Sequence, residues 1–588
     1  MESNSDLDKS SGQETASPSG TGSEAVKHLN ELQDLLSELS FVNPQPRDAS
    51  GFEVLRNKVL HQISDYLIPR MSNLGAPLLV VVGGSTGSGK STLVNSLLGE
   101  QVSLSGAVRP TTRTPVLAFN PVDQPFFESD RILPELKRVA GGGFNAQGGA
   151  SSNQALLMAP RQQVPQGLAI LDAPDIDSVS DENRELAGQL LNAADLWIFV
   201  TTANRYADAL PWDLLTEAGA RKITVCVVLN RVPPGAENDI VPDLKRLLSD
   251  KDLDPTLLHV LNETQLGEEK LIPSEHVEPL LAWLNSLAAD SAQRQRIAAQ
   301  TLDGALRRTA ADVSELIAEL QEQENQLGEL RTLTGERFAQ ALARINDSLN
   351  DGSLLRGEIL ARWQDFVGAG ELLRGIEGAI GRVRDRVGAF LTGKPPATHR
   401  VEQAIESGLH TVFIAEITKA CHDIDRSWQN TPFGHALRAN LPTPRPPQDL
   451  NEQASESIRL WQKDVLDMIR QEGAGKRKTA RMAAFGVNGV AVILMVVVFA
   501  STAGLTGLEI GIAGGSALVG QKLLEAIFGE DAVRRMATKA RKMLDSRARD
   551  LLAKSSSIYL DELSATSQPE LADRLGKITA GLNGKGAH

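Results

Sequence analysis

The residues best suited to chemistry in this chain lie between positions 84 and 91. They are Gly84, Ser85, Thr86, Gly87, Ser88, Gly89, Lys90 and Ser91, and they fit the pattern G-x-x-x-x-G-K-[ST] at every fixed position. The glycines let the backbone curl so that successive N–H groups face one anion, and a following helix adds its positive end. Lys90 can reach the β- and γ-phosphates of a nucleotide, and the Ser91 hydroxyl can ligate Mg²⁺. The pattern predicts a nucleotide-binding loop that runs from Gly84 into Thr92.

A loop of this kind needs a strand before it and a helix after it. Residues 78–82 are an apolar, β-branched run, which is typical of a strand buried on both faces. From Ser91 onward, Leu93, Leu97 and Leu98 recur at helical spacing. The alternative is a Gly/Ser-rich turn that matches by chance, and the order of strand, loop and helix argues against it.

Two further residues have types that suit a magnesium site. Thr112 lies in a polar, turn-rich stretch about 20 residues after Lys90, where a switch threonine completes Mg²⁺ coordination when a γ-phosphate is present. A plain Pro/Thr turn is the alternative for that stretch. Asp172 ends the apolar run 168–172, and a carboxylate at the end of a buried strand can hold Mg²⁺ through water. We therefore expect Ser91, Thr112 and Asp172 around the metal.

The remaining strand-like runs place Asn230 and Arg231 near the same site. Residues 196–201, 223–232 and 257–261 are further expected strands, and Asn230 stands near the carboxyl end of the second. In an open parallel α/β sheet, ligands bind beyond those ends. The sequence predicts a mixed, mostly parallel α/β domain with these motifs converging at one edge.

The order of these motifs resembles that of P-loop GTPases. The segments Arg109-Pro-Thr-Thr-Arg-Thr-Pro115, Leu171-Asp-Ala-Pro-Asp-Ile-Asp-Ser-Val179 and Leu196-Trp-Ile-Phe-Val-Thr-Thr-Ala-Asn-Arg-Tyr-Ala-Asp208 are similar to those of the actinobacterial dynamin-family (YfjP-like) membrane GTPases. The resemblance implies Mg²⁺-dependent hydrolysis of GTP, membrane remodelling or scaffolding with a possible role in cell division, and a homo-oligomer or a paired dynamin-like partner. It also makes Arg109 and Arg113 candidates for an arginine finger, and dimerisation could supply the same stabilisation.

Two positions depart from the family pattern. Asp175 replaces the glycine whose N–H would contact the γ-phosphate, and it puts a carboxylate near an anion. After Asn230-Arg231-Val232, Pro233 follows where a base-reading aspartate is expected. Guanine specificity is thus implied only by the resemblance, and ATP stays open as a substrate. An ATP-driven membrane protein and a nucleotide-binding scaffold without turnover are the alternatives.

The rest of the chain is expected to be helical. We expect a disordered tail over 1–24, helices over 25–71, the nucleotide domain over 72–289, a helical stalk over 290–475 and C-terminal helices over 522–588. Within the stalk, leucines and valines recur at mostly heptad-like spacing, which indicates a coiled-coil or bundle packing: Leu302, Leu306, Val313, Leu316, Leu320 and Leu327. The amphipathic segment 530–563 could pack on this bundle or lie on a membrane, and packing is favoured.

Residues 482–521 are predicted to form a transmembrane hairpin or re-entrant pair. No charged residue occurs from position 482 to position 505, and this uncharged stretch is longer than the ~20 residues needed to cross a bilayer. A buried core helix is the alternative. Basic residues on both flanks favour a multi-pass protein of the cell membrane with its soluble domains in the cytoplasm, and they would attract anionic lipid: Lys476, Arg477, Lys478, Arg481, Lys522, Arg534, Arg535, Lys539, Arg541 and Lys542.

Composition narrows the class of partner. The formal net charge of −14 argues against general nucleic-acid binding, because the chain has no overall excess of Lys and Arg over Asp and Glu to neutralise phosphates. Two cysteines cannot form a disulfide framework, and Cys226 in an apolar run is expected to be buried. The N-terminus has no apolar stretch behind a basic start, so we expect no signal peptide.

Overall fold

The chain forms two compact units in the computed structural model. The described residues are 20–42, 51–103, 114–128, 132–140, 155–177, 181–267, 269–350, 354, 358–367, 396–442, 445–474, 486–500 and 513–585. The first unit comprises Met1–Phe41, Arg47–Glu322 and Gln568–His588, and the second comprises Val42–Pro46 and Gln323–Ser567. The expected 1–24 tail lies mostly outside the described residues.

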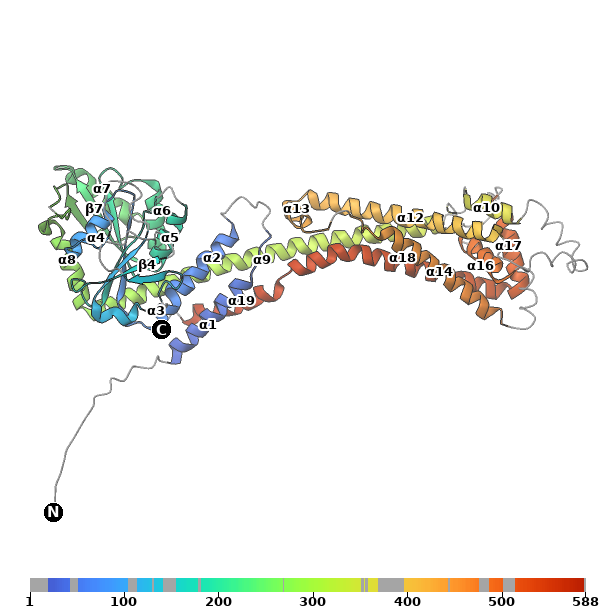
Figure 1. The fold of residues 1–588 in the computed structure, drawn as a ribbon, viewed down its shortest axis with the longest axis horizontal. Coiled ribbons are helices and arrows are strands. Elements are labelled where there is room, and N and C mark those ends of the chain that lie inside the picture. The colour runs from blue at the N-terminus through green and yellow to red at the C-terminus, as the bar shows by residue number, and fades with distance from the viewer. Residues whose placement is uncertain are drawn as a thin grey trace, which may run out of the picture. The chain divides into compact units, whose positions relative to one another are not determined.

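An eight-stranded sheet is the centre of the first unit (Figure 1). Its strands are β1 (Leu78–Gly84), β2 (Val116–Phe119), β3 (Lys137–Ala140), β4 (Ala155–Pro160), β5 (Leu168–Asp172), β6 (Leu196–Thr202), β7 (Thr224–Val232) and β8 (Leu258–Asn262). They are ordered β3-β4-β2-β5-β1-β6-β7-β8, and among these described strands only β2 and β5 pair antiparallel. The predicted mixed, mostly parallel sheet is confirmed.

The apolar run before the glycine-rich loop becomes the central strand because both of its faces are covered. β1 lies between β5 and β6 in parallel register. Leu79 and Val81 belong to the core on one face of the sheet, while Leu78, Val80 and Val82 belong to the core on the other. A strand buried in this way places its carboxyl end, and the loop that follows, at the edge where parallel α/β proteins bind ligands.

Helices cover the sheet and extend the first unit. They are α1 (Gly20–Glu38), α2 (Phe52–Gln62), the π-helix η1 (Ile63–Leu67), α3 (Ile68–Ser72), α4 (Lys90–Leu98), the 3₁₀-helix η2 (Pro121–Phe126), α5 (Asp181–Asn192), α6 (Ala209–Ala220), α7 (Glu237–Ser249), α8 (Ser274–Ala289), the first part of α9 (Ser291–Asn350) and α19 (Pro569–Lys585). Near-terminal α1 and α19 meet in one apolar core, where Leu29, Leu32 and Leu36 lie with Leu575.

The described elements of the second unit are all helical, which agrees with the helical region expected after the sheet. They are the remainder of α9, α10 (Glu358–Val367), α12 (Pro396–Gln429), α13 (Pro432–Arg438), α14 (Leu450–Glu472), α16 (Gly486–Ala500), α17 (Ala513–Phe528) and α18 (Glu530–Thr566). Residues 368–395 of the predicted 290–475 stalk lie outside the described residues. The predicted amphipathic segment 530–563 lies in α18, which packs on α14 and α16, and packing was the favoured alternative.

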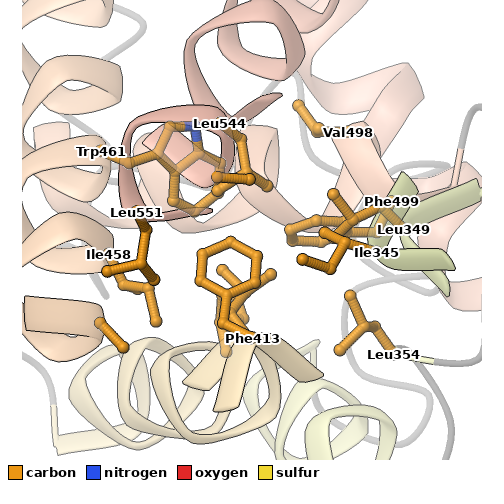
Figure 2. Packing of buried hydrophobic residues seen from close by; sticks show 14 of the residues in the cluster. Ile345, Leu349, Leu354, Phe413, Ile458, Trp461, Val498, Phe499, Leu544 and Leu551 are labelled. Carbon is orange, nitrogen blue, oxygen red and sulfur yellow. The ribbon is translucent and has the colours of Figure 1, made fainter. Parts of the chain in front are cut away.

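Figure 2 shows how these helices share one core. The side chains that converge there come from five different helices: Ile345, Phe413, Ile458, Trp461, Phe499 and Leu551. Trp461 Nε1 donates a hydrogen bond to the Ala540 carbonyl at 2.8 Å, and its ring centroid lies 5.9 Å from that of Phe499. Trp461 thus links α14 to both α18 and α16.

The described residues 486–500 of the predicted transmembrane hairpin form the buried helix α16 in this core, which is the alternative of a core helix and not the membrane-crossing segment that we expected; residues 482–485 and 501–512 lie outside the described residues. α16 has 15 residues, and every side chain from Val490 to Phe499 is at most 2% exposed. α12, α14, α17 and α18 pack around it. A helix that is apolar on all sides must be buried either in lipid or in protein, so composition alone does not separate the two. None of the described helices combines the length and the apolar character that crossing a membrane requires.

Candidate functional site

The glycine-rich loop connects the carboxyl end of β1 to the first turn of α4, as the pattern predicts. Gly84, Gly87 and Gly89 all have positive φ, at 148°, 75° and 95°. A Cβ on Gly84 would lie 2.1 Å from the Val200 carbonyl oxygen of β6, and one on Gly89 would lie 2.6 Å from Asn230 Nδ2. Only glycine fits these positions, so the loop can curl against the neighbouring strands.

Lys90 is the first residue of α4, and its side chain turns back into the loop. Its Nζ donates to the carbonyl oxygens of Gly84 and Ser85, at 3.0 and 3.1 Å, and forms an ion pair with Asp175. The Lys90 side chain is only 4% exposed and that of Asp175 18%. A buried ammonium needs such partners, and the three acceptors match its three N–H donors.

The Ser85 and Ser88 hydroxyls of the loop are buried and, within the described part of the chain, have no hydrogen-bond partner. Unpartnered buried hydroxyls are uncommon in folded proteins. Together with the curled backbone and the Lys90 ammonium, they form a polar cradle whose donors suit phosphate oxygens.

Asp172, at the end of β5, faces the start of α4. The carboxyl group is fully buried, and it accepts hydrogen bonds from the hydroxyls of Ser103 and Ser91. Burial raises the pKa of Asp172, and these hydrogen bonds oppose that shift. Its Oδ1 has no donor among the described residues. A carboxylate oxygen and a serine hydroxyl are hard oxygen ligands, so Asp172 and Ser91 fit a Mg²⁺ ion or its bound water.

A third carboxylate, that of Asp177, contacts the loop, and no motif in the sequence assigned it a role. Asp177 accepts a hydrogen bond from Thr86 Oγ1 at 2.6 Å and pairs with Arg205, which also donates to the Thr86 carbonyl at 2.9 Å. Burial would raise the pKa of Asp177, but the bonds from Thr86 and the Arg205 guanidinium outweigh it and lower that pKa. Arg205 and Asp177 both lie in the segments that carry the family resemblance, which was the available signal.

Asn230 braces the loop from β7. Its Nδ2 donates to the Ser88 carbonyl at 2.8 Å, and its Oδ1 accepts from the Arg231 N–H at 2.9 Å. Arg231 is exposed and adopts a positive φ of 54° beside an irregularity in the β7–β8 pairing. These contacts place Asn230 against the glycine-rich loop. Recognition of a nucleotide base by Asn230 or Arg231 stays a prediction.

The other predicted residues have different outcomes. Thr92 lies half-buried on α4 beside Ser91. Thr112, with Arg109 and Arg113, lies outside the described residues, so its role at the metal stays a prediction. The structure thus brings together the loop, Lys90, Ser91, Asp172 and Asn230, and adds Asp175, Asp177, Ser103 and Arg205.

Comparison with known proteins places these features in context. No family model matches the chain. A curated relative from Arabidopsis thaliana, described as a probable transmembrane GTPase, FZO-like and chloroplastic, is 24% identical over 192 residues. That match covers 31% of this chain and only 19% of the relative's length.

Three of the solved structures that match this chain are of bacterial dynamins. Two come from work on an oligomerised bacterial dynamin pair that is described as providing a mechanism for the long-range sensing and tethering of membranes. The first is 11% identical with a TM-score of 0.35 and covers 95% of this chain and 95% of its own. The second is 10% identical with a TM-score of 0.36 and covers 95% of this chain and 99% of its own. LeoA, a dynamin GTPase from ETEC, is 13% identical with a TM-score of 0.22, covering 96% of this chain and 94% of its own. This chain is similar over about a third of its length to a curated FZO-like GTPase, and its motifs resemble those of dynamin-family GTPases.

Proposed function

We propose that this protein is a dynamin-like GTPase that hydrolyses GTP to GDP and phosphate and couples its nucleotide state to membrane remodelling or scaffolding. The observation that carries the proposal is the convergence of Lys90, Ser91 and Asp172 on one glycine-rich loop. These groups supply the anion donors and the hard oxygen ligands that phosphoryl transfer from a nucleotide requires.

In the proposed mechanism the chain's residues hold and orient the triphosphate. The loop N–H groups and Lys90 bind the β- and γ-phosphates, while Ser91 and Asp172 hold Mg²⁺, with Thr112 as a further ligand. When bound, the ion neutralises charge on the phosphate oxygens. Water attacks the γ-phosphorus in line, and the bond from that phosphorus to the bridging oxygen breaks so that GDP leaves. Arg109, Arg113 or a second nucleotide domain would supply additional positive charge.

We also propose that the protein associates with a membrane. The relative from Arabidopsis thaliana is described as a transmembrane GTPase. In the second unit, α18 exposes Arg534, Arg535, Lys539 and Lys542. Basic side chains near an anionic membrane contribute ~1 kcal/mol each. We infer attachment of this unit to the cell membrane from the cytoplasmic side, in an oligomer or with a paired dynamin-like protein.

One observation favours a second candidate, a nucleotide-gated scaffold without turnover. Asp175 pairs with the lysine that a γ-phosphate would need. Such a protein would bind nucleotide but release no phosphate, which a single-turnover assay would detect.

Lys90→Ala tests the phosphate site directly. It removes the buried ammonium, so binding of fluorescent GDP in the presence of Mg²⁺ should weaken at least about 100-fold, the effect of losing a charged phosphate contact of roughly 3 kcal/mol. Lys245→Ala removes an exposed lysine of α7 and should bind as the wild type does. Equal affinity of all three proteins would overturn the assignment of the site.

A further inference from the structure

The three protons of the Lys90 ammonium are all engaged within the protein. Two go to the carbonyls of Gly84 and Ser85, and the third goes to the Asp175 carboxylate. An ammonium has three donors and no more. A nucleotide phosphate can therefore gain a hydrogen bond from Lys90 only by displacing one of these acceptors.

Asp175 is the charged member of this set and is held in place on both sides. Before it, the Ala173 N–H donates to the Val82 carbonyl at 3.2 Å, and after it, the Ile176 N–H donates to the Gly84 carbonyl at 3.4 Å. The Ile176 side chain is 4% exposed, and Asp177 is fixed by Thr86 and Arg205. Segment 173–177 thus lies alongside the glycine-rich loop, and the contacts of the residues next to Asp175 hold its carboxylate against Lys90.

We propose that Asp175 is an affinity-determining residue that competes with nucleotide phosphate for Lys90. A charge-assisted hydrogen bond is about twice as strong as a neutral one, so the carboxylate is the strongest of the three acceptors to displace. An incoming phosphate that leaves the pair intact would instead bring a second anion beside Asp175. Either route lowers the affinity for di- and triphosphates, because part of the binding energy is used to free Lys90.

The inference rests on the proposed function, since it requires that the loop bind nucleotide. The ligand that competes with Asp175 for Lys90 is expected to be a nucleotide with at least two phosphates, because its β-phosphate is a group that reaches the lysine. The same contact in the absence of nucleotide satisfies the buried charge of Lys90, so removing Asp175 should make the free protein less stable while it makes the complex tighter.

The test measures the dissociation constants of GDP and of a non-hydrolysable GTP analogue, with Mg²⁺, for the wild type and for Asp175→Asn. The asparagine keeps the size of the side chain and removes its charge. We expect both ligands to bind about tenfold or more tightly, the value of one charged hydrogen bond. Asp175→Gly, which restores the family's residue, should behave in the same way and serves as a second variant if the asparagine protein folds poorly.

Two controls separate competition from a change of net charge or of fold. Asp250→Asn removes an exposed charge at the end of α7 and should leave both constants unchanged. In a double-mutant cycle, Asp175→Asn should tighten binding less in a Lys90→Ala background than in the wild type, because the contested ammonium is gone and only the repulsion between Asp175 and phosphate is relieved. Thermal unfolding without nucleotide should show a lower midpoint for Asp175→Asn than for Asp250→Asn.

The outcomes distinguish this inference from the proposed function. Unchanged or weaker binding of Asp175→Asn, with normal binding by the wild type, would overturn the competition and leave the nucleotide site standing. An equal gain from Asp175→Asn with and without Lys90 would also overturn it. If neither the wild type nor any variant bound GDP or the analogue, the proposed function itself would fail.

Discussion

Asp195 connects several elements of the first unit through buried polar contacts. It precedes β6, is fully buried and forms an ion pair with Arg70 of α3. Its Oδ2 accepts the N–H of Leu79 at 2.8 Å, its Oδ1 accepts the Tyr66 hydroxyl at 3.1 Å, and its carbonyl accepts Thr301 Oγ1 at 3.1 Å. One residue therefore fixes β1, the helices before it and α9.

Asp195→Asn should destabilise the first unit by about 3 kcal/mol, because it leaves the Arg70 guanidinium buried without its counter-charge. Urea denaturation, followed by a probe in the first unit, measures the loss. Asp250→Asn is the matched control, since that carboxylate is exposed, and it should change little. Equal stability of the two variants would show that Asp195 does not organise this region.

The two cysteines should be inert in the native protein. Cys226 and Cys421 are at most 1% exposed, and burial raises their pKa to about 12 and about 11. At pH 8 a thiol reagent should therefore label neither until the protein is unfolded, when both should react. Because the unfolded thiols lose their protons at lower pH than the folded ones, the free energy of unfolding should fall as pH rises above about 9. Rapid labelling of native protein would contradict this burial.

The residue types of the site could be predicted from the sequence, but their pairings could not. The glycine-rich pattern identifies Lys90 and Ser91, and the strand end identifies Asp172. The ion pair of Lys90 with Asp175 and the contact of Thr86 with Asp177 depend on how the β5 and β1 ends align, and spacing along the chain does not determine that alignment. Asp175 was recognised as a departure from a family pattern, and only the structure shows the group that it contacts.

At the scale of elements, the sequence predicts most of the buried strands but misses β3 and the largely buried β4. β1, β5, β6 and β7 are apolar runs with turn residues at their ends. β3 has exposed ends and no buried side chain, so it carries no hydrophobic signal. β4 begins after a glycine-rich stretch and ends at Pro160, which weakens a strand prediction.

The error at α16 has a physical reason. An 18- to 24-residue apolar run is typical of a membrane helix, but a helix surrounded by four others needs the same composition. The helices that cover α16 come from both sides of it in the chain, with α12 and α14 before it and α17 and α18 after it, and local hydropathy does not reveal these neighbours.

Substitution of α16 can distinguish a protein core from a lipid-facing helix. Leu494→Ala removes a fully buried side chain and should cost about 2–5 kcal/mol in the free energy of unfolding, measured in buffer without detergent. Leu518→Ala in α17 is the control, since Leu518 is 39% exposed. Small and equal effects at both positions would show that the α16 core does not form in solution.

At the scale of the whole molecule, the described chain joins a unit that holds the glycine-rich loop and the sheet to a helical unit. The α1 and α19 segments lie together in the first unit although more than 500 residues separate them, and buried leucines such as Leu32 and Leu575 belong to one shared core. Amphipathic periodicity predicts each helix separately, but it does not specify which other helix covers its apolar face.

The central claim is most directly tested by Mg²⁺-dependent hydrolysis of GTP and ATP by the full chain, with and without anionic liposomes. We predict phosphate release from GTP in preference to ATP, an increase when anionic liposomes but not neutral ones are added, and loss of turnover in Lys90→Ala. Preference for ATP, or GTP turnover that survives Lys90→Ala, would contradict the account.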